Sequence, residues 1–343
     1  ILTKHLLNSR LEEEKTAVIN KKYEINESAT QLASPADRTD FPTEEPIDAV
    51  LFAQWKAANI FAQKQEGFFG VTIKVQLGNV YNKDARALAA IVKDGFAADD
   101  IRATQNQGFL LKYVREGALI PLFNRLYAIG MVKPGFDTTA DITACPGTDT
   151  CNLGIASSYG IARKLESVMD EEYEDLIYNN DIKIKISGCM NACGQHSAAN
   201  IGFQGMTIKK GPYVMPALQI LLGGGFDKDY NATVANKIVK VPSKVAPDAF
   251  RAIMDNFAEN AVEGEYFNNF YQRKVEDDKM YFFSILKPFT VLPEELPEDY
   301  FIDWGDEEKY VKAIGVGECA GVVLDVVGTL IMEAEEKFAL ATK

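Results

Sequence analysis

The pattern of hydrophobic and polar positions changes character near residue 66. Residues 1–65 begin with a charged stretch of helical periodicity and continue, at 26–46, through text rich in Asn, Ser, Thr and Pro, which predicts a linker. Beyond residue 66, segments that alternate like strands take turns with segments of helical periodicity, in the order 68–77, 85–92, 101–113 and 118–129. This order of strand, helix, strand and helix predicts a small α+β module over residues 66–138.

A different pattern runs through residues 139–245. Helical periodicity over 153–169 precedes three stretches with the character of strands, which are 182–187, 200–208 and 215–222. This arrangement predicts a mixed α/β domain, so the expected fold class of the whole chain is α+β. Residues 246–343 are mainly helical by periodicity, most clearly at 247–260 and 318–338, and predict a helical closing segment followed by an acidic appendage.

Composition narrows the classes of function. The chain of 343 residues has 36 Lys and Arg against 49 Asp and Glu, a net charge of −13, which argues against a general nucleic-acid binder because phosphate contacts need a basic surface. The longest nearly apolar stretch, 320–332, is interrupted by Asp325 and is shorter than the roughly 20 residues of a membrane-spanning helix, so no membrane partner is expected. Residue 1 is Ile, and the chain is therefore expected to lack its natural N-terminus.

The acidity is not evenly spread. Residues 181–244 carry eight basic and three acidic side chains and are locally positive. The lysines of this segment are Lys183, Lys185, Lys209, Lys210, Lys228, Lys237, Lys240 and Lys244. A solvated face is the simpler interpretation of these lysines, and a docking face for an acidic electron donor is the alternative.

Four of the five cysteines form two pairs, Cys145 with Cys151 and Cys189 with Cys193. The pairs have the form C-x5-C and C-x3-C, with 37 residues between them. Four thiolates hold either a tetrahedral zinc ion or a [4Fe-4S] cluster. Because the five-residue gap with its Pro and Gly makes a wide loop, the spacing favours the cluster; zinc and purely structural cysteines remain as alternatives. Clustered thiols also indicate a reducing, cytoplasmic compartment.

Two sequence segments resemble those of a known family. TACPGTDTCNLG at 143–154 and ISGCMNACGQHSAANIGFQG at 186–205 resemble the signature of siroheme-dependent nitrite and sulfite reductases. The resemblance implies a ferredoxin-like half-domain at 66–138 followed by a siroheme and [4Fe-4S] domain at 139–245. It also implies that Cys145, Cys151, Cys189 and Cys193 bind one [4Fe-4S] cluster, with Cys193 bridging to the siroheme iron.

The same resemblance implies roles for residues away from the cysteines. Asn191 resembles an Asn that family members place against the macrocycle, although it can equally stabilise a tight turn. IRATQNQ at 101–107 resembles the R-x-T-x-N-Q text of the second half-domain, so Arg102, Asn106 and Gln107 would face the siroheme cavity and its carboxylates. Ordinary hydrogen bonding at a strand edge is the alternative for these three.

This sequence departs from the family pattern in two ways. Met190 stands where many members have Pro, a change that leaves the cysteines in place. The resemblance also covers only the second of two duplicated halves, roughly residues 66–275. The first half, in which the basic residues that grip the substrate are expected, is missing, so residues 1–65 are interpreted as the bridge from it, and that half is an expected partner in the same or a separate chain.

The resemblance implies six-electron reduction of nitrite to ammonia or of sulfite to sulfide, with ferredoxin as a plausible electron donor. CPGTDTC at 145–151 together with CGQ at 193–195 favours nitrite. A non-catalytic iron–sulfur electron-transfer subunit and a structural zinc protein are alternatives from other classes. His196 suits proton donation by its position but is expected to have a supporting or surface role, and Cys319 is expected to be a buried small side chain.

Overall fold

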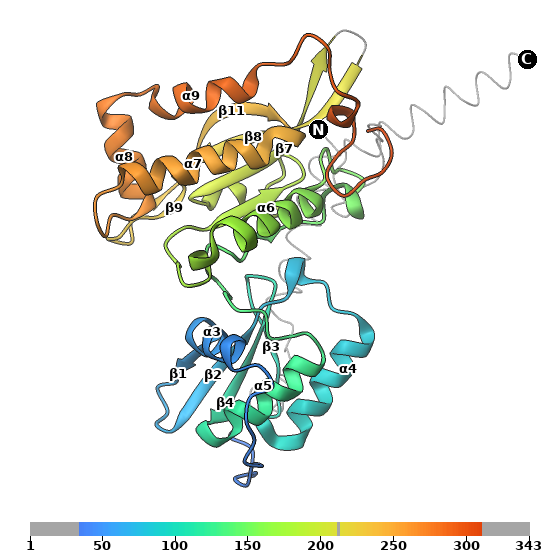
Figure 1. Cartoon of the computed structure of the whole chain (residues 1–343), viewed down its shortest axis with the longest axis vertical. Helices are drawn as coiled ribbons and strands as arrows, with labels where there is room; N and C mark the ends of the chain where they lie inside the picture. The colour runs from blue at the N-terminus through green and yellow to red at the C-terminus, as the bar shows by residue number, and fades with distance from the viewer. Residues whose placement is uncertain (1–33, 211–212, 311–343) are drawn as a thin grey trace, which may run out of the picture.

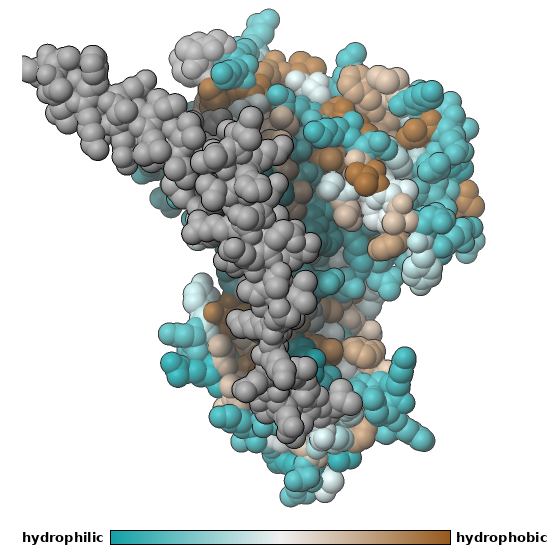
Figure 2. Space-filling view, turned by 180° about the vertical axis from the view of Figure 1, so that it is seen from behind, coloured by the Kyte–Doolittle hydropathy of each residue, from teal (hydrophilic) through white to brown (hydrophobic). Residues whose placement is uncertain are grey.

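The computed structural model describes residues 34–210 and 213–310. Two α+β units follow each other along the chain, the first below the second in Figure 1. Figure 2 shows the opposite face, where the units form two lobes and, on the part not covered by grey atoms, hydrophobic side chains are scattered among hydrophilic ones. In the described part of the chain, no helix is long and apolar enough to cross a membrane.

The first unit is a four-stranded antiparallel sheet of order β1-β2-β4-β3 with three helices. Its elements are α3 (Ala49–Asn59), β1 (Ile60–Ala62), β2 (Phe68–Ile73), α4 (Asn82–Ile91), β3 (Arg102–Ala103), β4 (Phe109–Arg115) and α5 (Leu119–Ala128). The predicted helices at 85–92 and 118–129 thus correspond to α4 and α5. The single strand predicted at 101–113 is instead a hairpin, because the chain turns at 104–108, where Gln107 has a positive φ of 65°.

The linker prediction for residues 1–65 is wrong for residues 49–62. Asp48 caps α3 by accepting a hydrogen bond from the Leu51 amide at 2.9 Å, and Trp55 on this helix is fully buried in the core of the first unit. β1, which follows, pairs with β2. The prediction missed this helix because its sequence directly follows a stretch that contains several prolines. Residues 1–33 lie outside the described residues.

The second unit is built on a five-stranded sheet of order β11-β8-β7-β6-β5. β5, β6 and β7 are parallel neighbours, whereas β7, β8 and β11 are antiparallel. Its elements are β5 (Thr143–Ala144), α6 (Ser158–Glu172), β6 (Ile184–Ser187), β7 (Ile201–Lys210), β8 (Tyr213–Leu222), β9 (Gly225–Phe226), β10 (Ala232–Thr233), β11 (Asn236–Pro242), α7 (Ala246–Asn260), α8 (Phe267–Asp277) and α9 (Tyr281–Leu286). Figure 1 shows α6 and α7 side by side against the sheet.

Local sequence explains the two elements that matter most for the site. In β6, Ile184 and Ile186 are buried, so the alternation that predicts this strand separates a core face from a lysine-bearing face. α6 begins at Ser158 because the Ser157 hydroxyl accepts a hydrogen bond from the Gly160 amide at 3.1 Å. The helix therefore starts five residues later than its periodicity predicts.

The chain beyond α7 only partly matches the predicted helical appendage. α8 and α9 are helical, but residues 287–310 are irregular apart from short 3₁₀ turns at Lys287–Thr290 and Glu298–Phe301. Pro288, Pro293 and Pro297 recur through this text and disfavour a continuous helix. The helix predicted at 318–338 and Cys319 lie outside the described residues.

Candidate functional site

The two cysteine pairs emerge from one edge of the second sheet. β5 and β6 are parallel neighbours in which Ala144 lies opposite Ile186, so Cys145 and Cys189 both follow the carboxyl ends of adjacent strands. The Cys145 amide donates a hydrogen bond to the Ile186 carbonyl at 3.2 Å. The parallel pairing of these strands therefore brings together loops that are more than 40 residues apart in the sequence.

The two cysteine loops contact each other through Gly188. Its amide donates to the Sγ of Cys145 at 3.2 Å, and its carbonyl accepts hydrogen bonds from the amides of Ile155 and Ala156 at 2.8 and 3.1 Å. An amide donating to a cysteine sulfur is an interaction that stabilises thiolate ligands and tunes iron–sulfur clusters. The segment after Cys151 is thus joined to the residue that precedes Cys189.

Two glycines permit this close approach of the loops. A Cβ atom on Gly188 would lie 2.6 Å from the Gly147 Cα, and one on Gly194 would lie 1.9 Å from the Ile186 carbonyl oxygen. Real Cβ atoms do not come so close, so any larger residue would force the backbones apart. The small residues beside the cysteines are therefore required by packing.

The four cysteines differ in exposure, and none of them forms a disulfide. Cys189 is buried, Cys145 and Cys151 are half-buried, and Cys193 is exposed. Among the described residues, no group of three or more His, Cys, Asp or Glu side chains is arranged to hold a single metal ion. Thiols on mutually hydrogen-bonded loops with an amide directed at sulfur fit the donor chemistry of an iron–sulfur cluster.

The Gln107 side chain bonds to the backbone of Ala144, a contact that its motif does not predict. Its side-chain amide donates to the Ala144 carbonyl at 2.8 Å, while its side-chain carbonyl accepts from the Ala144 amide at 3.0 Å. This is the strand-edge bonding that was the alternative for the motif. It connects the turn of the β3–β4 hairpin to the residue immediately before Cys145.

The other two residues of the R-x-T-x-N-Q motif, Arg102 and Asn106, bond to two different carboxylates. Arg102 is exposed and donates to the Asp100 carboxylate at 2.7 Å. Asn106 donates to the Asp137 carboxylate and lines a cavity of about 550 Å³. Asn191 is exposed and lies in the turn between Cys189 and Cys193.

The cavity lined by Asn106 lies between the two units, and Gln195, two residues after Cys193, also lines it. Lys185, on the polar face of β6, and Lys183, immediately before this strand, also line it. Lys185 donates to the Gln195 side chain at 2.7 Å, and burial lowers the pKa of Lys185 below its ordinary value. The sequence indicated these lysines only as part of a basic segment; their position on the strand that leads into Cys189 was the available signal.

Several other lysines of the basic segment are occupied by contacts within the chain. Lys210 donates to the Pro293 carbonyl at 2.6 Å, Lys240 donates to the Thr207 carbonyl at 3.3 Å, and Lys244 lies 4.4 Å above the Trp304 ring. The segment is therefore not one uniform free face, and the docking interpretation gains no support from these residues.

His196 is buried directly after the second cysteine pair. Its Nδ1 atom has no hydrogen-bond partner among the described residues, and burial lowers its pKa. Burial that disfavours the charged imidazolium also disfavours a role as proton donor. This environment agrees with the expectation that His196 supports the loop.

Two buried acidic side chains were not indicated by the sequence. Asp141, which lines the cavity, is buried, and this burial raises its pKa to about 6. Glu166 on α6 lies 3.5 Å from the ammonium group of Lys74, and both side chains are almost completely buried. Their positions depend on contact between the two units, which no local pattern reports.

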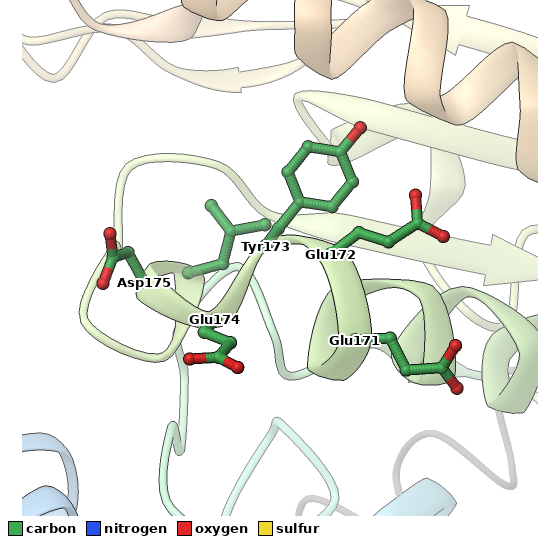
Figure 3. Close-up of a pocket in the computed structure, with 6 residues that line it drawn as sticks. Glu171, Glu172, Tyr173, Glu174 and Asp175 are labelled. Carbon is green, nitrogen blue, oxygen red and sulfur yellow. The ribbon is translucent and has the colours of Figure 1, made fainter.

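A second hollow, of about 520 Å³, lies at the opposite end of α6 from the cysteine loops. It is lined by acidic residues around Tyr173, whose hydroxyl donates to Asp255 at 2.7 Å. Figure 3 shows the carboxylates of Glu171, Glu174 and Asp175 pointing in different directions and not toward a common point. This hollow has no arrangement that suits a metal or a cofactor.

Comparison with known families agrees with this division of the chain. Residues 61–129 match the nitrite/sulfite reductase ferredoxin-like half domain, and residues 135–274 match the nitrite and sulphite reductase 4Fe-4S domain. The chain belongs to the nitrite and sulfite reductase family. The resemblance and the α+β fold class inferred from the sequence are thereby confirmed.

Both nitrite reductases and sulfite reductases are similar to this chain. It is 28% identical over 217 residues to the assimilatory ferredoxin-dependent nitrite reductase of Haloferax mediterranei, covering 63% of this chain and 36% of that protein. It is 27% identical over 242 residues to a sulfite reductase [ferredoxin] of Mycobacterium tuberculosis, covering 69% of this chain and 41% of that protein. The chain thus spans about two fifths of the length of these relatives.

Solved structures give the same result for the fold of this reductase-family chain. The Mycobacterium tuberculosis NirA protein matches with a TM-score of 0.56 and 26% identity over 70% of this chain and 43% of that one. Dissimilatory sulfite reductase I matches with a TM-score of 0.50 and 12% identity over 71% of this chain and 76% of that one, and shows the fold alone.

Proposed function

We propose that the chain is the cofactor-binding C-terminal half of a siroheme- and [4Fe-4S]-dependent nitrite or sulfite reductase. In this proposal Cys145, Cys151, Cys189 and Cys193 bind one [4Fe-4S] cluster, and Cys193 also bridges to the siroheme iron. The observation that carries it is the hydrogen bond from the Gly188 amide to the Cys145 sulfur, which joins the two cysteine loops and directs a donor at a thiolate ligand.

The residues of this chain would have distinct tasks around the cofactors. When bound, the cofactor pair would relay electrons from the donor and supply the anion-binding iron for six-electron reduction. Gly188 would donate to thiolate sulfur, and the loops would keep Cys193, the exposed cysteine, at the surface toward the siroheme. Lys183 and Lys185 line the cavity together with four aspartates, and Lys183 is paired with Asp137 at 2.8 Å. Lys185 would therefore be the basic side chain that could bond to a siroheme carboxylate or an anionic substrate.

The substrate is proposed from the sequence motifs, and the electron donor from the names of the relatives. Nitrite is the proposed substrate, on the CPGTDTC and CGQ text, and sulfite is the alternative because relatives of both kinds have similar identity. Ferredoxin is proposed as the electron donor because the names of those relatives specify it. The first half, which would contribute the basic residues that grip the anion, is proposed as a partner within a longer chain or as a separate one.

One observation favours a second candidate, an iron–sulfur electron-transfer subunit without siroheme. Arg102 and Gln107, which the motif assigns to the siroheme cavity, bond instead to Asp100 and Ala144. In this alternative the hairpin motif supports the cysteine loop and no macrocycle lies against it. The cluster ligands are the same in both proposals.

A spectrum of the protein made in a host that synthesises siroheme, with iron and acid-labile sulfide measured on the same sample, tests both proposals. Porphyrinoid bands together with sulfide are expected for the reductase. Sulfide without those bands is expected for the electron carrier, or for a chain that needs the first half to close the siroheme pocket. Protein with neither, or with stoichiometric zinc, would overturn both. Cys193→Ser should lose the siroheme bands and weaken the cluster, whereas Cys319→Ser should leave both intact; equal loss would refute the assignment of Cys193.

A further inference from the structure

The last described segment of the chain returns to the cysteine loops. Residues 298–310, which we call the strap, lie beyond residue 274, where the match to the 4Fe-4S domain family ends. Figure 1 shows this red segment beside the N-terminal end of α6, far in sequence from the elements it covers. The strap therefore packs on the cofactor domain although it is no part of the matched family domain.

Asp303 is the centre of this contact. It is only 1% exposed, and its carboxylate accepts hydrogen bonds from the Ser157 amide at 2.7 Å, the Ser243 hydroxyl at 2.6 Å and the Trp304 amide at 2.8 Å. A carboxylate is buried at high cost unless donors surround it, and this one has three. A buried, fully hydrogen-bonded carboxylate fixes the relative positions of the groups that donate to it.

Tyr310 adds a second contact to the same short stretch of backbone. Its hydroxyl donates to the Ile155 carbonyl at 2.6 Å. The Ser157 amide donates to Asp303, so the strap contacts both ends of the tripeptide 155–157. This tripeptide follows Cys151 and immediately precedes α6.

The opposite side of the tripeptide faces the other cysteine pair. The amides of Ile155 and Ala156 donate to the Gly188 carbonyl, and the Gly188 amide donates to the Cys145 sulfur. One continuous path of hydrogen bonds therefore leads from the strap through the tripeptide to a cysteine sulfur.

The strap packs closely against α6. A Cβ atom on Gly160 would lie 1.6 Å from the Trp304 carbonyl oxygen, so the strap rests directly on the backbone of the first turn of α6. The Trp304 indole also donates to the Ser243 carbonyl at 2.8 Å. The strap is thus held by contacts to α6 and to the segment before α7.

We propose that the strap positions the cluster-binding loops: Asp303 and Tyr310 hold the tripeptide 155–157 against Gly188, and retention of the cluster depends on this brace. The inference rests on the proposed cluster. Neither residue touches the cofactor, so both are positioning residues. Loss of such a supporting hydrogen bond commonly costs about 10- to 100-fold in metal affinity.

The test measures iron release to a ferrous chelator from the cluster-reconstituted full chain. Asp303→Asn and Tyr310→Phe are compared with Glu308→Gln, which changes an exposed acid on the same strap. Both strap variants are expected to release iron about 10- to 100-fold faster than wild type and to alter the electron paramagnetic resonance signal of the reduced cluster. The thermal midpoint of the cluster-free chain is recorded for every variant.

The outcomes separate this inference from the proposed function. Release rates and spectra equal to those of Glu308→Gln, with a cluster present in wild type, would overturn the strap proposal alone. A wild-type chain that takes up no cluster would overturn the proposed function and the strap proposal together. If Asp303→Asn does not fold, Tyr310→Phe decides, since it removes one hydroxyl; faster iron release that merely parallels a lower midpoint of the cluster-free chain would also refute a positioning role.

Discussion

Gln107 and Ala144 form a two-point hydrogen-bonded pair across the junction of the two units. The Gln107 side chain donates to the Ala144 carbonyl and accepts from its amide, at 2.8 and 3.0 Å, as a neighbouring strand would. Gln107 thus serves as a one-residue extension of the second sheet beyond its edge strand β5. Because Ala144 precedes Cys145, the first unit directly supports the first cysteine of the site.

Replacement of Gln107 by Ala should therefore weaken both stability and cofactor retention. Loss of the side chain leaves the Ala144 amide and carbonyl without these partners, which predicts a fall of about 1–3 kcal/mol in the free energy of unfolding. Urea unfolding measures this fall, and iron content after reconstitution measures retention. Gln105→Ala, an exposed neighbour in the same turn, is the control and should behave as wild type; equal effects in the two variants would contradict the role of Gln107.

The part of the site that local sequence predicts is the part built from local structure. The alternation of Ile184 and Ile186 predicts β6, and the cysteine spacing indicates two loops that can share one cofactor. The parallel pairing of β5 with β6 is the step that makes these loops neighbours, and no local pattern predicts it. The family resemblance implied only that the four cysteines share one cluster.

Contacts between distant segments lie beyond such prediction. Gln107 meets a residue 37 positions away, and Asp303 meets Ser157 across 146 positions. A motif or a run of polar residues contains no information about such a partner. α3 was missed for a different reason: its cap, Asp48, is a local signal, but the stretch with several prolines at 26–46 led residues 1–65 to be interpreted as a linker.

The buried ion pair of Lys74 and Glu166 predicts a large effect of neutralising one partner. Glu166→Gln keeps the size of the side chain but removes the carboxylate charge that lies 3.5 Å from the Lys74 ammonium, which is 0% exposed. The free energy of unfolding should fall by about 3–5 kcal/mol, as measured by urea unfolding. Replacing Lys74 by Met in the same protein should recover part of this loss.

The control for the ion pair lies one turn further along α6. Asp170 is 43% exposed and pairs with Lys133 at 2.7 Å, so Asp170→Asn should cost about 0–1 kcal/mol. Losses of similar size in the Glu166 and Asp170 variants would show that the buried pair contributes no more than a surface pair.

Asp141 predicts a pH dependence of stability. Burial raises its pKa from 3.8 to about 6, so between these values the folded chain retains a proton that the unfolded chain has lost. The free energy of unfolding should therefore decrease as pH rises through this window, by about 3 kcal/mol in total. Asp141→Asn lacks this decrease and should become more stable than wild type as pH approaches neutrality. Urea unfolding of both proteins between about pH 4 and 7 tests this; parallel curves would contradict it.

Gly194 offers the sharpest test of how closely the second cysteine loop must pack. A Cβ atom there would lie 1.9 Å from the Ile186 carbonyl, on the strand that leads into Cys189. Gly194→Ala must move either the loop or β6, so we expect a loss of more than about 3 kcal/mol in stability, at the level of strong overpacking, together with a reduced iron content. Gly117→Ala is the matched control, because a Cβ at Gly117 meets no atom closer than 4.0 Å. That variant should be as stable as wild type. Normal cluster uptake by Gly194→Ala would mean that the loops can separate without losing the cofactor.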